Sequence, residues 1–135
     1  MTHDSTLRDF VLDLYSDLGD RAAFDRRLHP DVTVWETPRA DLMRGIAELD
    51  ELRGPARAPG ERRDPLPDVR PVQIVTDRYD DTGLIRYVLE VRDPSGGELL
   101  ELVRVTDVLR RDGTGWRIVH HHAQDLALPA PRPSA

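Results

Sequence analysis

Three consecutive histidines and one aspartate lie in a predicted β-hairpin near the C-terminus. Residues 103–124 alternate apolar and polar side chains on either side of the sequence DGTG at 112–115, where glycine permits the positive φ of a tight turn. Counting pairs outward from this turn places Asp107 opposite His120, with His122 two residues further along the same face. The face of the hairpin that should be buried therefore carries a carboxylate and two imidazoles among apolar residues.

Such groups can do chemistry, or they can serve only to stabilise the fold. An unpaired buried carboxylate costs several kcal/mol, whereas directly opposed residues have Cβ atoms about 4.5–5.5 Å apart, so Asp107 and His120 are natural partners. A structural ion pair and a functional pocket both satisfy this argument. In either case the carboxylate should raise the pKa of His120 above its ordinary value of about 6.5. The second histidine favours a pocket.

Composition limits the class of protein. A chain of 135 residues fits one domain, which we expect to span residues 1–128, followed by a Pro-rich tail at 129–135 that should be disordered. A formal charge of −6 argues against nucleic acid or an anionic membrane as the main partner. There is no cysteine and no signal-like apolar segment at the N-terminus, so a cytoplasmic location is expected.

The chemistry available is also restricted. All 19 basic residues are arginine, and the absence of lysine excludes both Schiff-base catalysis and a phosphate-binding P-loop. The four serines do not lie in a G-x-S-x-G turn, which argues against a serine hydrolase of that type. An enzyme with this sequence would work by acid–base chemistry through His, Asp or Glu, or through a bound metal.

The order of predicted elements indicates an α+β fold. An amphipathic helix over residues 7–18, a short helix after Asp20 and a third near residues 46–52 accompany a brief strand at 32–36. The segment 54–68, rich in Pro, Gly and charge, is expected to be a mobile loop that could gate a pocket. Strands at 69–76, 84–92 and 99–111 precede the histidine strand. These elements predict a curved, cone-shaped antiparallel sheet with the N-terminal helices packed on its concave face.

Two sequence segments resemble one superfamily. GDRAAFDRRLHPDVTVWETP, residues 19–38, is similar to the Gly-Asp, short helix, strand and acidic-Pro signature of the nuclear-transport-factor-two-like proteins, which include SnoaL-like polyketide cyclases and ketosteroid isomerase. RRDGTGWRIVHHHAQ resembles the closing hairpin of SnoaL-like relatives and of the calmodulin-dependent kinase association domain. The resemblance covers most of residues 5–125. It implies a conical pocket lined by the concave face of the sheet and the first helices.

The resemblance also implies roles for individual residues. Glu36 falls where the isomerase has its general base, and Asp107 matches an oxyanion-binding acid of that enzyme. Pocket positions on the last strand fall on His120, His122 and Gln124, where the isomerase has apolar residues, and this argues against a steroid. Leu12 takes the place of the isomerase's oxyanion tyrosine, and Tyr15 lies about one helical turn away. Glu36 as a solvated strand-end residue and Tyr15 as a packing residue remain alternatives.

Two classes of function follow. The first is a lyase, cyclase, isomerase or dehydratase in which Glu36 removes a proton beside a carbonyl while Asp107 or His120 stabilises the enolate. The second is a non-catalytic module that binds a small ligand or mediates homodimerisation. His120 and His122 with an acidic partner could alternatively hold zinc, but we expect no metal and no cofactor. The partners expected are a small molecule, bound with help from His122, Gln124 and Tyr15, and a second copy of the chain.

Overall fold

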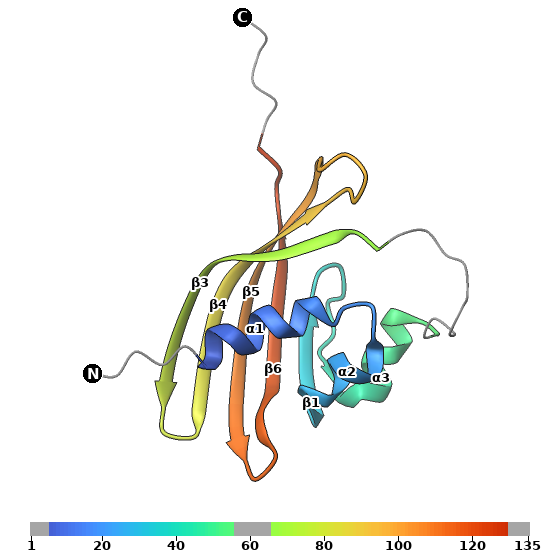
Figure 1. Ribbon diagram of the computed structural model, residues 1–135. Helices are drawn as coiled ribbons and strands as arrows, with labels where there is room; N and C mark the ends of the chain where they lie inside the picture. The colour runs from blue at the N-terminus through green and yellow to red at the C-terminus, as the bar shows by residue number, and fades with distance from the viewer. Residues whose placement is uncertain (1–5, 56–65, 130–135) are drawn as a thin grey trace, which may run out of the picture.

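The computed structural model describes residues 6–55 and 66–129, which form a six-stranded sheet and three helices (Figure 1). The strands lie in the order β2-β1-β6-β5-β4-β3. Along the chain the elements are α1 (Thr6–Ser16), α2 (Arg21–Arg26), β1 (Leu28–Glu36), β2 (Met43–Arg44), α3 (Gly45–Arg53), β3 (Asp68–Tyr79), β4 (Thr82–Arg92), β5 (Leu99–Asp112) and β6 (Gly115–Leu126).

All three helices lie on one side of the sheet. In Figure 1, α1 crosses in front of the long strands, while α2 and α3 lie beside β1. Helix α1 packs its buried residues Leu7, Val11 and Leu14 against the inward side chains of the strands, as its helical apolar spacing predicts. The opposite face of the sheet is not covered by any element of the described chain. The core is therefore a single layer between the helices and the concave side.

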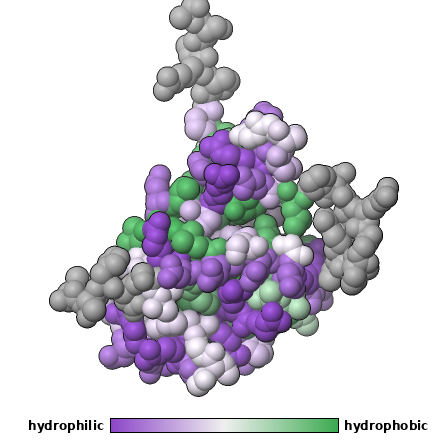
Figure 2. Space-filling model, viewed as in Figure 1, coloured by the Kyte–Doolittle hydropathy of each residue, from purple (hydrophilic) through white to green (hydrophobic). Residues whose placement is uncertain are grey.

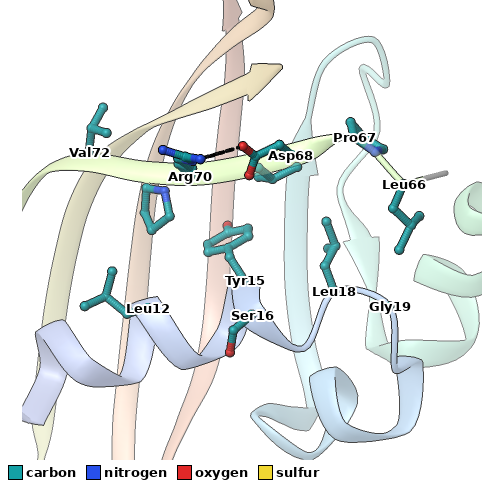
Figure 3. Close-up of a pocket in the computed structure, with 12 residues that line it drawn as sticks. Leu12, Tyr15, Ser16, Leu18, Gly19, Leu66, Pro67, Asp68, Arg70 and Val72 are labelled. Carbon is teal, nitrogen blue, oxygen red and sulfur yellow. Dashed lines mark hydrogen bonds and ion pairs between the residues drawn. The ribbon is translucent and has the colours of Figure 1, made fainter. Parts of the chain in front are cut away.

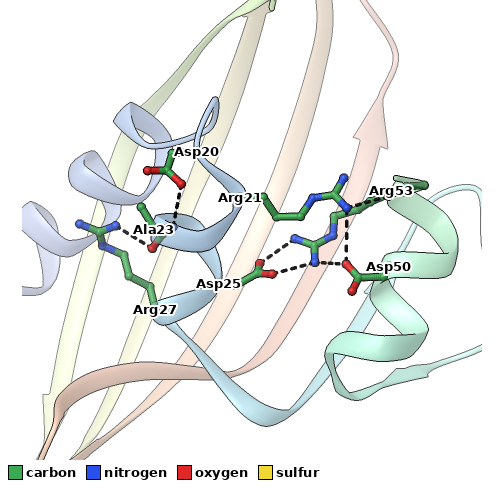
Figure 4. A network of polar contacts seen from close by, with 8 residues as sticks. Asp20, Arg21, Ala23, Asp25, Arg27, Asp50 and Arg53 are labelled. Atoms are coloured by element: carbon green, nitrogen blue, oxygen red, sulfur yellow. Dashed lines mark hydrogen bonds and ion pairs between the residues drawn. The ribbon is translucent and has the colours of Figure 1, made fainter. Parts of the chain in front are cut away.

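A network of charges holds α2 to α3 (Figure 4). Arg53 donates to both carboxylate oxygens of Asp25, at 2.7 and 3.0 Å, and also pairs with Asp50. Arg21 adds a hydrogen bond to the carbonyl oxygen of Gly54 at 2.6 Å. The bidentate geometry is the strongest that arginine offers a carboxylate. These contacts fix the two short helices beside β1, which supplies one wall of the site.

The sheet contains one irregularity that matters for function. From the hairpin turn outward, β5 and β6 pair as expected as far as Leu109 with Ile118, but the next pair is Val108 with His120. Val119 is therefore the additional residue of a β-bulge, a feature that reverses the alternation of side chains beyond it. Asp107 consequently lies opposite His121, and Val105 opposite Ala123. The predicted pairing of Asp107 with His120 is wrong.

The α+β fold with helices on one face of a curved sheet is confirmed. One part of the description needs correction, because β1 runs parallel to β6 and the sheet is mixed rather than wholly antiparallel. The two-residue strand β2 was not predicted, since two residues carry no periodic signal. Most of the predicted loop, residues 56–65, and the tail at 130–135 lie outside the described residues. None of the helices in the described part is long and apolar enough to cross a membrane.

Candidate active site

A buried carboxylate and a histidine form the centre of the site. Asp107, in the middle of β5, is completely buried, and its Oδ1 lies 2.5 Å from Nδ1 of His121 on β6. The bulge at Val119 turns His121 toward the concave side, where Ile118 and Ala123 also point. With Asp107 ionised, Nδ1 of His121 must carry the proton of this hydrogen bond. The imidazole is thereby held with Nε2 directed away from Asp107.

Two tyrosines extend this pair into a continuous chain of hydrogen bonds. The hydroxyl of Tyr87, on β4, donates to Oδ2 of Asp107 at 2.6 Å, so both carboxylate oxygens of Asp107 are occupied. The hydroxyl of Tyr15, on α1, lies 2.7 Å from that of Tyr87. The two rings meet edge to face with centroids 5.7 Å apart. Burial, followed by neighbouring negative charge, raises the pKa of Tyr15 well above its ordinary value, so its phenol remains neutral.

Glu36 lies on the other side of His121. It continues the inward alternation of Val32 and Val34 at the last residue of β1, and Pro38 follows two residues later. Oε2 of Glu36 is 3.9 Å from Nε2 of His121, a separation too long for a hydrogen bond. Both groups therefore retain hydrogen-bonding capacity for a ligand atom. The Glu36 side chain is 25 % exposed and that of His121 is 17 % exposed.

The charge on His121 depends on opposing influences. Burial alone lowers the pKa of the imidazole, but the charge of Asp107, its hydrogen bond and the charge of Glu36 together raise the pKa above the ordinary value. An imidazolium in this place donates from Nδ1 to Asp107 and can donate from Nε2 to a ligand. The arrangement can therefore supply a proton, or positive charge, to an oxygen atom bound next to Glu36.

These residues open into a cavity of about 470 Å³. Its wall includes Tyr15, Glu36 and His121 together with Leu18 after α1, Phe24 of α2 and apolar side chains of the strands. A smaller cavity of about 120 Å³ adjoins it, sharing Phe24, Glu36 and His121. The larger volume lies within the range of about 300–1,000 Å³ typical of small-molecule sites. The site thus combines a pocket with convergent polar groups, which come from Tyr15, Glu36, Asp107 and His121.

A groove between α1 and the start of β3 leads to this cavity. It has a volume of about 510 Å³ and shares Tyr15, Leu18 and Val69 with the cavity. In Figure 3, Tyr15 rises from α1 toward β3, and the ion pair between Asp68 and Arg70 lies on β3, across the groove from α1. Figure 2 shows apolar residues gathered along the same region, between the helix and the strand. A ligand entering here would meet an apolar surface before it reached the polar groups.

Three predicted site residues lie elsewhere. Beyond the bulge, His120, His122 and Gln124 point to the uncovered face of the sheet, so none of them lines the cavity of about 470 Å³ where the sequence places them. His122 and Gln124 instead line a separate cavity of about 310 Å³ beside Trp35 and the end of β1. His120 forms a 2.7 Å hydrogen bond with Thr33, and burial together with its neighbouring histidines lowers its pKa. The ring of His122 lies 6.1 Å from that of Trp35.

Gln124 contributes to that outer face in a different way, because its Oε1 accepts a hydrogen bond from Arg104 at 2.9 Å. The set suggested for zinc is consequently divided between two faces of the sheet. Within residues 6–55 and 66–129, no three His, Cys, Asp or Glu side chains gather as metal ligands would.

Comparison with known families agrees with the fold and the pocket. The profile of the SnoaL-like domain matches residues 12–124, which is most of the chain. The chain belongs to the SnoaL-like family. The matched region of this SnoaL-like domain includes the residues of the candidate site, which are Tyr15, Glu36, Tyr87, Asp107 and His121. No curated protein sequence matches it.

Solved structures similar to the SnoaL-like domain include proteins of different kinds. The CaMKII hub of S. rosetta superposes with a TM-score of 0.72 at 18 % identity, covering 93 % of this chain and 98 % of the hub. An NTF2-like protein from Pseudomonas putida gives 0.73 at 17 %, covering 96 % and 95 %. A ketosteroid isomerase-like protein from Erwinia carotovora atroseptica gives 0.65 at 14 %, covering 92 % and 96 %. At these identities the similarity establishes the fold alone.

Sequence reasoning missed two residues of the site. Strict alternation counted from the turn predicts His121 on the outer face, and a bulge leaves no clear mark in a single sequence. Alternation in the strand predicted at 84–92 indicates only that Tyr87 points inward, although a buried tyrosine usually finds a partner for its hydroxyl. A search for an inward tyrosine beside Asp107 on the neighbouring strand would have found it, because Tyr87 and Asp107 lie on the same face of adjacent strands.

Proposed function

We propose that this SnoaL-like domain is an acid–base enzyme acting on a carbonyl compound, as a lyase, cyclase or isomerase. Glu36 is the base that removes a proton from the carbon next to the carbonyl. His121, oriented by Asp107, donates from Nε2 to the developing enolate oxygen. The observation that supports these roles most directly is the 3.9 Å separation of Glu36 Oε2 and His121 Nε2 on the cavity wall. A carbonyl and its adjacent carbon could occupy positions next to these two atoms.

Asp107 is a positioning residue in this proposal. Its two oxygens accept from His121 and Tyr87, so it touches no ligand and fixes the orientation of the imidazole. An amide at this position would keep the shape of the side chain but remove the charge that favours the imidazolium. The acid role of His121 would then weaken while the pocket remained.

The second candidate is a non-catalytic module that binds a small ligand and forms a homodimer. Two observations favour it: the similarity to the CaMKII hub and the apolar residues on the uncovered face of the sheet, where Leu100 is 43 % exposed. Relatives with and without catalytic activity share this fold, so the fold cannot decide. Dimerisation is also compatible with catalysis, because the outer face and the cavity lie on opposite sides of the sheet.

Proton exchange separates these candidates without knowledge of the complete reaction. The protein is incubated in D2O with a panel of small ketones and β-keto esters, and loss of the signal of the α-proton is followed by NMR. Catalysed exchange is expected in the parent, with a reduction of about 10²- to 10⁴-fold in Glu36→Gln and in His121→Gln. His29→Gln, which changes a histidine outside the cavities around Glu36, is the matched control and should retain the parent rate. Binding of panel compounds without exchange would favour the second candidate.

A further inference from the structure

The cavity presents mainly hydrogen-bond acceptors to a ligand, and the chain of tyrosines explains why. A tyrosine hydroxyl has one proton, and that of Tyr87 is donated to Asp107. The 2.7 Å contact between Tyr15 and Tyr87 therefore requires the proton of Tyr15. The oxygen of Tyr15 is left with a lone pair on the cavity side. With Asp107 ionised, Tyr15 can accept a hydrogen bond from a ligand but has no proton left to donate.

Three carboxylates on the same wall are also acceptors. Glu36 at the end of β1, Glu101 on β5 and Asp125 on β6 all line the cavity. Within the described part of the chain, no arginine forms an ion pair with any of the three, and the one charged contact of Glu36 is His121. Glu101 and Asp125 are exposed and are not neutralised by any arginine of the described chain, whereas Glu36 faces the imidazole of His121. A ligand group placed among them gains most if it is a cationic hydrogen-bond donor.

Groups that would attract an anion are scarce in this cavity. His121 is the one side chain of the described cavity wall that can carry a positive charge. Arg53 lines the smaller adjoining cavity, but its guanidinium is already paired with Asp25 and Asp50. A carboxylate ligand would therefore face three carboxylates and one imidazole. The charges of the wall disfavour such a ligand.

The remainder of the wall is apolar. Phe24 stands edge to face against the ring of Tyr15, with ring centroids 6.4 Å apart, and adds an aromatic surface to the cavity wall. An aromatic ring next to a cationic head group adds attraction through its negative face. The other apolar side chains of the wall are Leu18, Pro38, Val69, Leu89, Val91, Val103 and Ala123.

We propose that this cavity binds an organic amine, with the protonated amino group among Tyr15, Glu36, Glu101 and Asp125 and an apolar body against Phe24 and the strands. The inference deepens the proposed function and rests on it in one respect: if the enzyme acts on a carbonyl compound, the substrate is an amino carbonyl compound whose carbonyl lies at His121. Binding of the amine itself is independent of any reaction.

The test compares three probes that share one apolar body: phenethylamine, 2-phenylethanol and phenylacetate. Binding to the full chain is measured at pH 7 and low salt by calorimetry, and the site is located by NMR shifts of the His121 ring. Phenethylamine should bind at least about tenfold more tightly than phenylacetate, with the alcohol between them. The double variant Glu101→Gln/Asp125→Asn should lose at least about tenfold in affinity for the amine and little for the alcohol.

A matched double variant controls for net charge. Asp31→Asn/Glu51→Gln removes the same two charges from exposed positions that do not line the cavity, and amine affinity should be retained. Equal or tighter binding of phenylacetate, an equal loss of amine affinity in both double variants, or no binding of any probe at millimolar concentration would overturn the proposal. Amine binding without α-proton exchange would refute the proposed catalysis alone, whereas exchange without amine preference would refute this inference alone.

Discussion

His121 and Asp107 differ greatly in exposure although their side chains are joined by a 2.5 Å hydrogen bond. The carboxylate is completely buried, whereas 17 % of the imidazole is exposed. Asp107 is thus the fixed partner, held from the other side by Tyr87, and His121 is the member that reaches the cavity. Because of this difference, mutation of Asp107 and mutation of His121 should have different consequences.

The first prediction concerns the titration of His121. The groups facing its ring are Asp107 on β5 and Glu36 on β1, and both raise its pKa against the effect of burial. A raised folded-state pKa means that the stabilisation is complete below the unfolded value of about 6.5 and is lost as pH rises through the folded value. NMR titration should give a pKa above 6.5 for His121 and below it for His120, whose pKa is lowered.

Asp107→Asn tests the cause of that shift. The amide is nearly isosteric but uncharged, so the pKa of His121 should fall, because burial would then be opposed mainly by Glu36. Most of the dependence of unfolding free energy on pH just above 6.5 should disappear. An unchanged pKa for His121 in Asp107→Asn, with the fold retained, would show that the two side chains are not paired.

The second prediction concerns Tyr87. Its replacement by phenylalanine removes a donor from the buried Oδ2 of Asp107 and an acceptor from Tyr15. Leaving buried polar groups without partners costs about 1–3 kcal/mol, which denaturant unfolding can measure. Tyr79→Phe is the control, since Tyr79 is 63 % exposed and should change little. Equal stability of the two variants would contradict the chain of hydrogen bonds.

The third prediction concerns the junction between α2 and α3. Arg53→Met should destabilise the protein by about 1–3 kcal/mol, because Asp25 and Asp50 lose a partner whose side chain is only 19 % exposed. Arg70→Met removes an ion pair in which the arginine is 66 % exposed, and no measurable change is expected. Thermal unfolding of both variants measures the two changes in stability. Similar changes would mean that burial of the arginine does not decide how much its ion pairs contribute to stability.

The fourth prediction concerns assembly. The outward residues of β5 include Leu102 and Val108, which are half-buried in the single chain and face no other element described here. Sedimentation at micromolar concentration should give twice the chain mass of 15.3 kDa. Val108→Asp should reduce this to one chain, whereas Leu12→Asp on α1, at an exposed position across the sheet, should not. A parent that sediments as a single chain would reject the homodimer.

Much of the fold could be predicted because its signals are local. The spacing of Leu7, Val11 and Leu14 predicts the face that α1 buries, and alternation in β4 predicts that Ile85, Tyr87 and Leu89 point inward. Asp107 lies on the concave side, as alternation counted from the hairpin turn predicts, because β5 is regular between the turn and this residue. The place of Glu36 in the pocket was implied by the family resemblance and not by alternation, and Glu36 lines the cavity.

The identity of the partner histidine could not be predicted in the same way. A bulge at Val119 is a property of the pairing between β5 and β6, and also coincides with a shift in the pairing of β6 with β1. The bulged register is favoured because it places the charged ring of His121 beside a buried carboxylate. Regular alternation would place the ring of His120 there and would gain the same interaction, so the interaction alone does not choose between the two registers. Tertiary packing around Asp107 decides between them.

The run of three histidines gives this site tolerance to changes in chain length. The bulge at Val119 places the middle histidine opposite Asp107. Deletion of Val119 would restore regular pairing and leave His121 opposite Asp107, whereas a deletion that kept a one-residue bulge would bring His122 there. Insertion of one more residue before the run, with the one-residue bulge kept, would place His120 opposite Asp107. Across three successive lengths of this strand, the residue facing Asp107 keeps its chemical identity, so insertions and deletions here can be accepted without losing the ion pair.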